Sequence, residues 1–242
     1  MPPLPRIACF HGGGSNSTIF ELQCSFLSSL LADTFVLEFF DGPFTRPAGP
    51  GVLPAFDGYA PYFSWFRPGT DAQLSNGNGA GYDDTGRDGI DRVLGLMRAR
   101  AKEKGFGMEM WVGALGFSQG TRVVGGLLLD QQRRAAVGER AGAGEGVELR
   151  FGVLCNGGGA PMESKAALGL DQPDTVVRIP TLHLHGLKDE FLVFGRDQLA
   201  KFYDPETAKL YEINYHHAMP WVKAESEELA RLFKELYNKT RA

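Results

Sequence analysis

Ser118 stands between two glycines in the pentapeptide GFSQG, which spans residues 116–120. In a G-x-S-x-G pattern that joins a strand to a helix, the serine sits on a sharp turn, where its hydroxyl can attack a carbonyl carbon. The setting matters, because a chain with 32 glycines can contain such a pentapeptide by accident. Here the apolar run Met108–Leu115 predicts a strand before the serine, and the pattern from Gln119 predicts a helix after it. Ser118 is therefore a candidate nucleophile.

A serine hydroxyl needs a base to remove its proton, and the base needs a carboxylate to orient it. In hydrolases with this serine turn, the acid and then the histidine follow the serine along the chain, each after a strand. Asp189 meets this requirement, because it follows the strand-like sequence LHLH through a turn at Gly186. Glu190 is the nearest competitor. Asp189 is the predicted orienting acid.

Two adjacent histidines, His216 and His217, follow the last strand-like run in the sequence YEINYHHAMP. A catalytic base is expected on a loop at the end of a strand, and both residues meet that condition. Their spacing alone does not separate them. The remaining histidines lie on or beside predicted strands and are expected to be structural; they are His11, His183 and His185.

An oxyanion hole needs two backbone N–H donors. One is expected from Gln119, directly after the nucleophile, and the other from a glycine-rich loop after an early strand. The sequence CFHGGGSNSTIF supplies such a loop, with Gly12 and Gly13 at its start. The alternatives are a tight turn or a phosphate-binding loop, but the G-x-G-x-x-G spacing and the P-loop lysine are both missing.

A long segment from Asp41 to Asp84 is dense in glycine, proline and asparagine, yet it carries many aromatic residues. A loop of this length within a compact domain is usually functional or disordered, and the aromatic content favours function. We expect the loop to lie over the site and to form an apolar wall for an acyl chain. The predicted wall residues are Tyr59, Tyr62, Phe63, Trp65 and Phe66. In the alternative, these rings only fasten the loop to the body of the domain.

The elements that must position these residues alternate along the chain. The predicted strands are Arg6–Phe10, Thr34–Phe40, Met108–Leu115, Glu148–Cys155, Thr181–His185 and Lys209–Tyr215. The predicted helices are Ser17–Ala32, with Ser17 as its cap, Gly89–Glu103, Gln119–Ala135 and Glu225–Lys239. This alternation predicts one α/β domain, residues 1–242, with a doubly wound, mainly parallel sheet of about six strands and helices on both faces.

Composition excludes several classes of protein. A net charge of −4 argues against nucleic acid and anionic membranes as partners, and no apolar run is long enough to cross a membrane. Three widely spaced cysteines do not form a disulfide framework or a zinc site. The first residues lack the pattern of a signal peptide. We therefore expect a cytoplasmic protein with no metal; the sequence does not indicate an oligomeric state.

Four stretches carry a family resemblance: IACFHGGGSNSTIF, GALGFSQGTRV, HLHGLKDE and the H-x-x-P of HHAMP. They resemble the fungal serine hydrolase family of α/β-hydrolases, which includes the human ovarian-tumour-associated serine hydrolase. The likeness covers nearly the whole chain. It implies Ser118 as nucleophile, Asp189 as orienting acid and His217, which begins H-x-x-P, as base. The family usually has glycine before that histidine, where this chain has His216.

The region PAGPGVLPAFDGYAPYFSWFRPG further resembles small polyketide-releasing thioesterases, typified by the lovastatin pathway enzyme. This resemblance implies hydrolysis of an acyl thioester through an acyl-enzyme, with the acyl chain presented by the carrier domain of a polyketide synthase. No metal or organic cofactor is required. Two alternatives remain at this point: a broad carboxylesterase acting on small oxygen esters, and a non-catalytic binding module that keeps the hydrolase fold.

Overall fold

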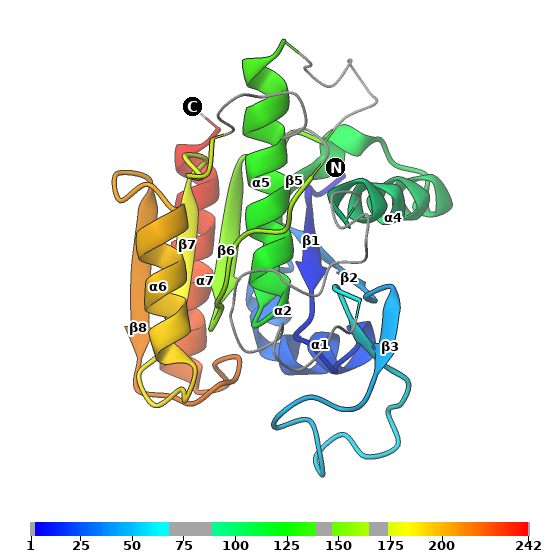
Figure 1. Ribbon diagram of the computed structural model, residues 1–242, viewed down its shortest axis with the longest axis vertical. Coiled ribbons are helices and arrows are strands. Elements are labelled where there is room, and N and C mark those ends of the chain that lie inside the picture. The colour runs from blue at the N-terminus through cyan, green and yellow to red at the C-terminus, as the bar shows by residue number, and fades with distance from the viewer. Residues whose placement is uncertain (1–2, 68–88, 139–146, 165–173, 242) are drawn as a thin grey trace.

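The computed structural model describes residues 3–67, 89–138, 147–164 and 174–241, so parts of the aromatic loop and of the stretch 135–146 lie outside the described residues. Its centre is a six-stranded sheet in the order β2-β1-β5-β6-β7-β8, and every neighbouring pair is parallel (Figure 1). The strands are β1 Arg6–Phe10, β2 Val36–Phe40, β5 Trp111–Phe117, β6 Phe151–Cys155, β7 Thr181–Gly186 and β8 Ala208–Ile213. The predicted α/β fold is confirmed.

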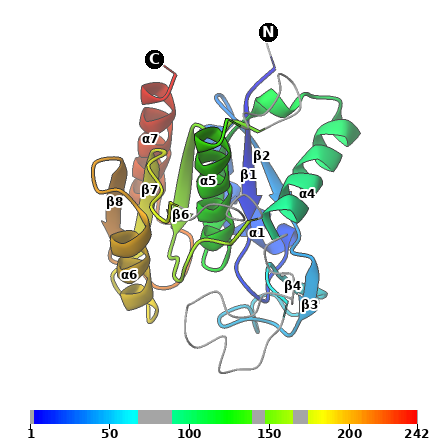
Figure 2. The ribbon, with the colours of Figure 1, turned by 45° about the horizontal axis from the view of Figure 1, so that its top comes forward.

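Both faces of the sheet are covered, because side chains alternate between two apolar cores. On β1, Ile7 and Cys9 belong to one core, whereas Ala8 and Phe10 belong to the other. Helices α1, α2 and α7 contribute to the first core, and α4, α5 and α6 to the second, as Figures 1 and 2 show. Their bounds are α1 Ser17–Gln23, α2 Ser25–Leu31, α4 Gly89–Lys104, α5 Gly120–Ala136, α6 Leu192–Phe202 and α7 Lys223–Lys239.

The first helical segment differs from the prediction. The segment Ser17–Ala32 is two short helices separated at Cys24, whose backbone (φ −94°, ψ 2°) leaves the helical region. The cap of α1 is Asn16, not Ser17: the Asn16 side chain accepts a hydrogen bond from the N–H of Ile19 at 2.9 Å. Asparagine at this position satisfies one of the N–H groups that the first turn leaves without a partner.

The sequence suggested that the aromatic loop is irregular throughout, but part of it has regular structure. It contains an antiparallel hairpin of β3 Phe44–Arg46 and β4 Tyr62–Ser64. Phe63 fastens the hairpin to the glycine-rich loop, because its N–H donates to Ser15 and its carbonyl accepts from Gly14, each at 2.7 Å. The hairpin lies beyond the carboxyl ends of β1 and β2 (Figure 1).

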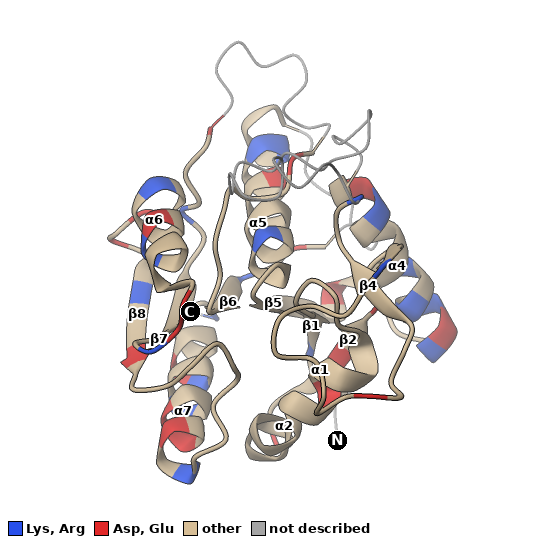
Figure 3. Ribbon diagram, turned by 60° about the horizontal axis from the view of Figure 1, so that its bottom comes forward, with Lys and Arg blue, Asp and Glu red and all other residues tan. Residues whose placement is uncertain are grey.

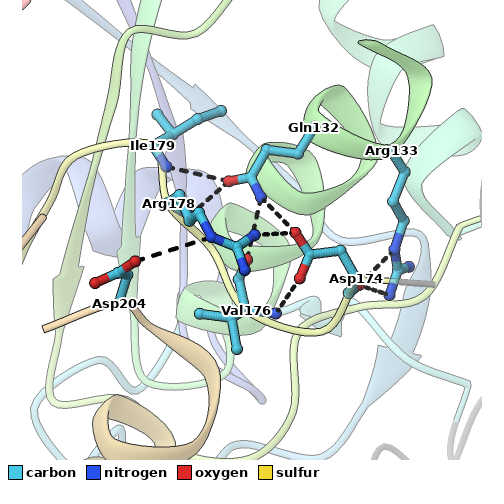
Figure 4. A network of polar contacts seen from close by, with 7 residues as sticks. All are labelled: Gln132, Arg133, Asp174, Val176, Arg178, Ile179 and Asp204. Carbon is cyan, nitrogen blue, oxygen red and sulfur yellow. Dashed lines mark hydrogen bonds and ion pairs between the residues drawn. The ribbon is translucent and has the colours of Figure 1, made fainter. Parts of the chain in front are cut away.

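A polar network fastens the approach to β7 against α5 (Figure 4). The Gln132 side-chain oxygen accepts from the N–H groups of Arg178 and Ile179, at 2.6 and 3.1 Å. Arg133 donates twice to the carbonyl of Asp174, at 2.9 and 2.6 Å. Because these bonds satisfy backbone groups outside the sheet, they fix where the chain enters β7, the strand that leads to Asp189.

Charge and cysteine placement agree with a globular domain. Figure 3 shows acidic and basic residues along α4, α5, α6 and α7. Cys9, Cys24 and Cys155 are free and buried, as small apolar residues. Within the described residues, no helix is long and apolar enough to cross a membrane, and no three metal-binding side chains gather at one point.

Two of the buried histidines predict how stability depends on pH. Burial lowers the pKa of His11 to about 4 and that of His183 to about 3, where the nearby His185 adds to the effect. Both therefore stay neutral in the fold, whereas in the unfolded chain they bind protons below about pH 6.5. The free energy of unfolding should then be highest above pH 6.5 and fall as the pH drops toward 4.

Urea denaturation at a series of pH values tests this expectation. Between pH 6.5 and pH 4, His183→Leu should reduce the slope of the free energy of unfolding against pH. The reduction should be up to about 1.4 kcal/mol per pH unit, the value for one proton. His216→Gln, which replaces an exposed imidazole, is the matched control. An unchanged slope in the His183 variant would contradict the expectation.

Candidate active site

The turn after β5 holds Ser118 in the left-handed region of backbone conformation, at φ 51°. Residues other than glycine adopt this region at an energetic cost, and they concentrate at functional sites. The turn is very tight. A methyl group on Gly120 would lie 2.0 Å from the carbonyl oxygen of Phe10, and one on Gly116 would lie 2.4 Å from the carbonyl oxygen of Gly120. Both glycines are therefore required for the serine turn to fit against β1.

The structure brings Asp189 and His217 together, although they come from the ends of different strands. Asp189 follows β7, and its Oδ2 lies 2.7 Å from Nδ1 of His217, which follows β8. The other carboxylate oxygen accepts from the N–H of Phe191 at 2.8 Å. The Asp189 side chain is only 2% exposed and that of His217 is 17% exposed. This arrangement holds a carboxylate behind an imidazole whose other nitrogen stays available.

The two competitors are placed elsewhere. His216 is exposed and its ring contacts Tyr215, with 5.7 Å between centroids. Glu190 is also exposed. The His217 ring, by contrast, packs against Phe117 and Phe191, with centroid distances of 5.0 and 4.9 Å. These two phenyl rings restrict the orientation of the imidazole.

The predicted oxyanion residues lie against the serine turn. A methyl group on Gly12 would lie 3.2 Å from Cβ of Ser118, and one on Gly13 would lie 3.2 Å from the side-chain amide of Gln119. Among the described residues, the backbone N–H groups of Gly13 and Gln119 find no protein acceptor. Gln119 also caps α5, so its N–H belongs to the positive end of that helix.

Asn156 connects the loops of the acid and the base, and sequence reasoning missed it. It follows β6 with φ 48°, a left-handed conformation that asparagine tolerates better than most residues. Its Oδ1 accepts from the N–H of Gly186, three residues before Asp189, at 2.8 Å. Its Nδ2 donates to the carbonyl of Ala218, next to His217, at 2.9 Å. One side chain thus fixes the separation of both loops.

A cavity of about 650 Å³ lies at this site. Ser118, His217, Gly12, Gly13 and Gln119 all line it. The apolar part of the wall consists of aromatic and small residues from four segments: Pro50, Val52, Phe66, Phe117, Phe191 and Phe194. A cavity of this size, apolar with a few polar groups, is typical of a site for an organic ligand.

The aromatic loop lines this cavity, but mostly with other residues than predicted. Phe66 is in the wall, whereas Tyr59, Tyr62, Phe63 and Trp65 are not. Trp65 is buried: its indole N–H donates to the carbonyl of His11 at 2.8 Å, and its ring packs on Phe10. The prediction did not foresee the hairpin, which buries Trp65 against the domain body, whereas Tyr59 stays 41% exposed. Trp65 fastens the loop, as in the alternative considered for these rings.

The other loop residues make local contacts. The Tyr62 hydroxyl donates to the carbonyl of Phe56 at 2.9 Å, and the Tyr59 carbonyl accepts from Asn16 at 2.7 Å. Among the loop residues that the structure describes, those that reach the cavity besides Phe66 are Arg46, Pro50, Gly51 and Val52. No sequence signal distinguished them, because proline, glycine and valine in a loop are common and a lone arginine usually faces water.

The fold and the site together define a hydrolase of the serine type. The chain belongs to the family whose model is described as serine hydrolase (FSH1), which matches residues 1–229. A probable esterase of Aspergillus terreus is 34% identical over 96% of this chain and 89% of its own length. Esterase citA of Monascus ruber is 34% identical over 99% of this chain and 94% of its own length.

Solved structures show the same fold at low identity. A carboxylesterase from Mesorhizobium loti has a TM-score of 0.59 at 17% identity, covering 95% of this chain and 88% of its own. Acyl-protein thioesterase 2 of Zea mays has a TM-score of 0.59 at 17% identity, covering 97% of this chain and 94% of its own. These likenesses confirm the α/β-hydrolase fold, and the family match confirms a serine hydrolase.

Asn156 yields a prediction about positioning. Asn156→Gly keeps the left-handed backbone but removes both hydrogen bonds, so the loops of Asp189 and His217 lose their link. We expect kcat to fall by about 10- to 100-fold with little change in KM, since small displacements of reacting groups cost rates of this order. Steady-state kinetics on an activated ester measure kcat and KM separately.

Asn156→Asp provides the graded comparison. It keeps the acceptor for Gly186 and loses the donor to Ala218, so it should retain more activity than Asn156→Gly. Asn238→Ala, which removes an exposed amide on α7, is the control. A change in KM alone would show that Asn156 acts on binding and not on the catalytic groups.

Proposed function

We propose that this serine hydrolase cleaves an acyl thioester through Ser118, His217 and Asp189, releasing a polyketide or fatty-acyl chain from an acyl carrier protein. The observation that carries the proposal is the contact of His217 with Asp189 at 2.7 Å, in a cavity that Ser118 also lines. Serine, aspartate and histidine in this chain order are the groups that a serine hydrolase needs.

The reaction has two halves. His217 removes the proton of Ser118 as the oxygen attacks the carbonyl carbon, and the imidazolium then protonates the leaving sulfur. A water molecule, deprotonated by the same imidazole, hydrolyses the acyl-enzyme and releases the acyl chain as a carboxylic acid. Asp189 holds the imidazole with Nδ1 toward itself, which leaves the other ring nitrogen for proton transfer.

The oxyanion is assigned to backbone donors around the serine turn. We assign the N–H of Gln119 and those of Gly12 and Gly13 to the negative oxygen of the tetrahedral intermediate. Donors fixed before the reaction stabilise developing charge without having to reorganise. The hairpin supports this arrangement, because Gln119 Oε1 accepts from Trp65 N at 2.9 Å and from the Ser64 hydroxyl at 3.1 Å.

The acyl group is assigned to the apolar part of the cavity. Pro50, Val52 and Phe66 from the loop line this part of the cavity. A wall of this kind favours medium or long acyl chains over acetyl groups, since burial of each methylene is worth about 0.8 kcal/mol. The three free, buried thiols are consistent with action in a reducing compartment, which we take to be the cytoplasm.

A carboxylesterase acting on oxygen esters is the second candidate. The observation that favours it is that several relatives, including citA, are named as esterases. The catalytic groups would be the same, so the two candidates differ only in the leaving atom. A non-catalytic binding module would require that Ser118 does not react with an activated phosphonate.

The triad assignment predicts which variants lose activity. Ser118→Ala and His217→Ala should each lower kcat by at least about 1,000-fold, because groups that act as a unit fail together. His216→Ala should retain most of the activity, since its side chain is exposed. Labelling by a fluorophosphonate should follow the same order, and circular dichroism checks the fold. An active His217→Ala with an inactive His216→Ala would reverse the assignment of the base.

Matched substrates test the leaving group. Hexanoyl and decanoyl groups are offered as N-acetylcysteamine thioesters and as the corresponding oxygen esters, and kcat/KM is measured for each. The proposal expects higher kcat/KM for the thioesters, rising with chain length. The Ser118→Ala variant provides the background rate for each substrate. Faster turnover of the oxygen esters would favour the carboxylesterase, and no labelling by a fluorophosphonate would favour the binding module.

A further inference from the structure

The cavity carries positive charge that the proposed reaction does not use. Two arginines line it, Arg46 from β3 and Arg122 from α5, and no aspartate or glutamate is among the described lining residues. The chain as a whole has a net charge of −4, so this local excess of positive charge does not reflect a basic protein. An enclosed space lined by charge of one sign attracts a ligand of the opposite sign.

Arg46 lies beside the serine turn. A methyl group on Gly13 would lie 3.1 Å from Nη1 of Arg46 and 3.2 Å from the Gln119 side chain, so both groups border the same small space. Arg46 is partly buried, and among the residues that the structure describes its side chain has no acidic partner and no hydrogen bond. A guanidinium group is planar and has several donors, which suits a carboxylate.

Arg122 is held in place by the protein. Its Nε donates to the carbonyl of Ala160 at 2.8 Å, and its guanidinium lies over the ring of Phe66 with 4.0 Å to the centroid. Arg122 is also four residues after Ser118, one turn into α5. It therefore supplies a fixed positive charge on the cavity wall, whereas Arg46 supplies donors beside the glycine-rich loop.

The sheet order indicates which part of a substrate meets Arg46. His217 follows β8 at one edge of the sheet, while the β3–β4 hairpin lies beyond β1 and β2 toward the other edge, as Figure 1 shows for these elements. Ser118 follows β5, between the two. The leaving atom must lie beside His217 to receive its proton. The acyl part then extends on the side of Arg46.

We infer that Arg46 binds an anionic group on the acyl part of the substrate, so that the enzyme selects acyl chains bearing a carboxylate near the reacting carbonyl. This inference rests on the proposed function and specifies its substrate class. Arg122 adds to the positive potential of the same cavity. An acyl chain with a neutral end would meet an arginine whose charge it cannot balance.

The acyl carrier protein holds its acyl chain through a phosphopantetheine arm, and the phosphate of that arm is the other anion to consider. That phosphate is separated from the thioester sulfur by the whole pantetheine chain, and it leaves with the sulfur on the His217 side. Arg46 borders Gly13 and Gln119, close to where the reacting carbonyl must lie. The placement therefore favours an anion on the acyl group over one at the far end of the leaving group.

The test compares a charged and a neutral acyl group of similar size. Glutaryl and monomethyl-glutaryl groups are offered as N-acetylcysteamine thioesters and as p-nitrophenyl esters. The wild-type enzyme should show a higher kcat/KM for glutaryl. Arg46→Gln should lower the glutaryl to methyl-glutaryl ratio by about 10- to 100-fold, the range expected for a hydrogen bond to a charged group. Arg46→Lys should retain part of the ratio.

Controls separate this inference from the proposed function. Arg196→Gln removes an exposed positive charge on α6, away from the cavity, and should leave the ratio unchanged. Fluorophosphonate labelling of each variant checks that the serine is still reactive. Because the ratio is also measured with p-nitrophenyl esters, it can be read even if thioesters prove poor substrates, which would contradict only the proposed function.

Three results would overturn the inference. The first is equal turnover of the two acyl groups by the wild-type enzyme. The second is an equal loss on both acyl groups in Arg46→Gln, which would show that Arg46 supports the glycine-rich loop and does not select substrate. The third is an Arg46 dependence that appears only when a neutral acyl group is carried by coenzyme A, which would assign the arginine to the phosphates of the leaving group.

Discussion

The backbone of the serine turn touches the end of β1 at a point where only glycine fits. The carbonyl oxygen of Phe10 lies so close to Gly120 that any side chain there would force β1 and α5 apart. That contact sets three things at once: the strained conformation of Ser118, the direction of α5, and the approach of the loop that begins at Gly12. Because β1 and β5 are neighbours with Phe10 beside Gly116, Ser118 and the proposed oxyanion donors share one register.

Asp189 and His217 depend on a longer chain of contacts. They arrive from β7 and β8, on the other side of β6, and no single turn brings them together. Asn156 at the end of β6 spans this gap, with one bond to each loop. Phe117 and Phe191 then limit the imidazole to a narrow range of orientations. Adjacent parallel strands thus contribute in turn to one cavity at their carboxyl ends, as open α/β sheets do.

Sequence patterns predicted the strands and singled out Ser118, Asp189 and His217 as candidates because each has a local signal. Apolar runs, a glycine on each side of Ser118, and an acid or histidine directly after a strand can all be recognised without knowing the fold. The residues that were missed have no such signal. Asn156 matters through two backbone groups distant in sequence, and Arg46 through its position on a hairpin that itself was read as loop. The aromatic residues misled for a related reason: Trp65 looks the same in sequence whether it faces a ligand or packs beneath His11.

The hairpin is attached to the domain body both at its base and within the segment that joins its strands. Phe63 pairs with the glycine-rich loop and Trp65 with Gln119, whereas the segment 47–61 between the two strands contributes Pro50, Gly51 and Val52 to the cavity. The attachments continue on both sides of these lining residues, because Gly49 donates to the carbonyl of Gly14 and the Tyr59 carbonyl accepts from Asn16. A substitution at Pro50, Gly51 or Val52 would change the cavity wall without removing the bonds from Gly49, Tyr59 and Phe63 that hold the loop. Substrate range can therefore evolve at these three positions while the serine turn stays as it is.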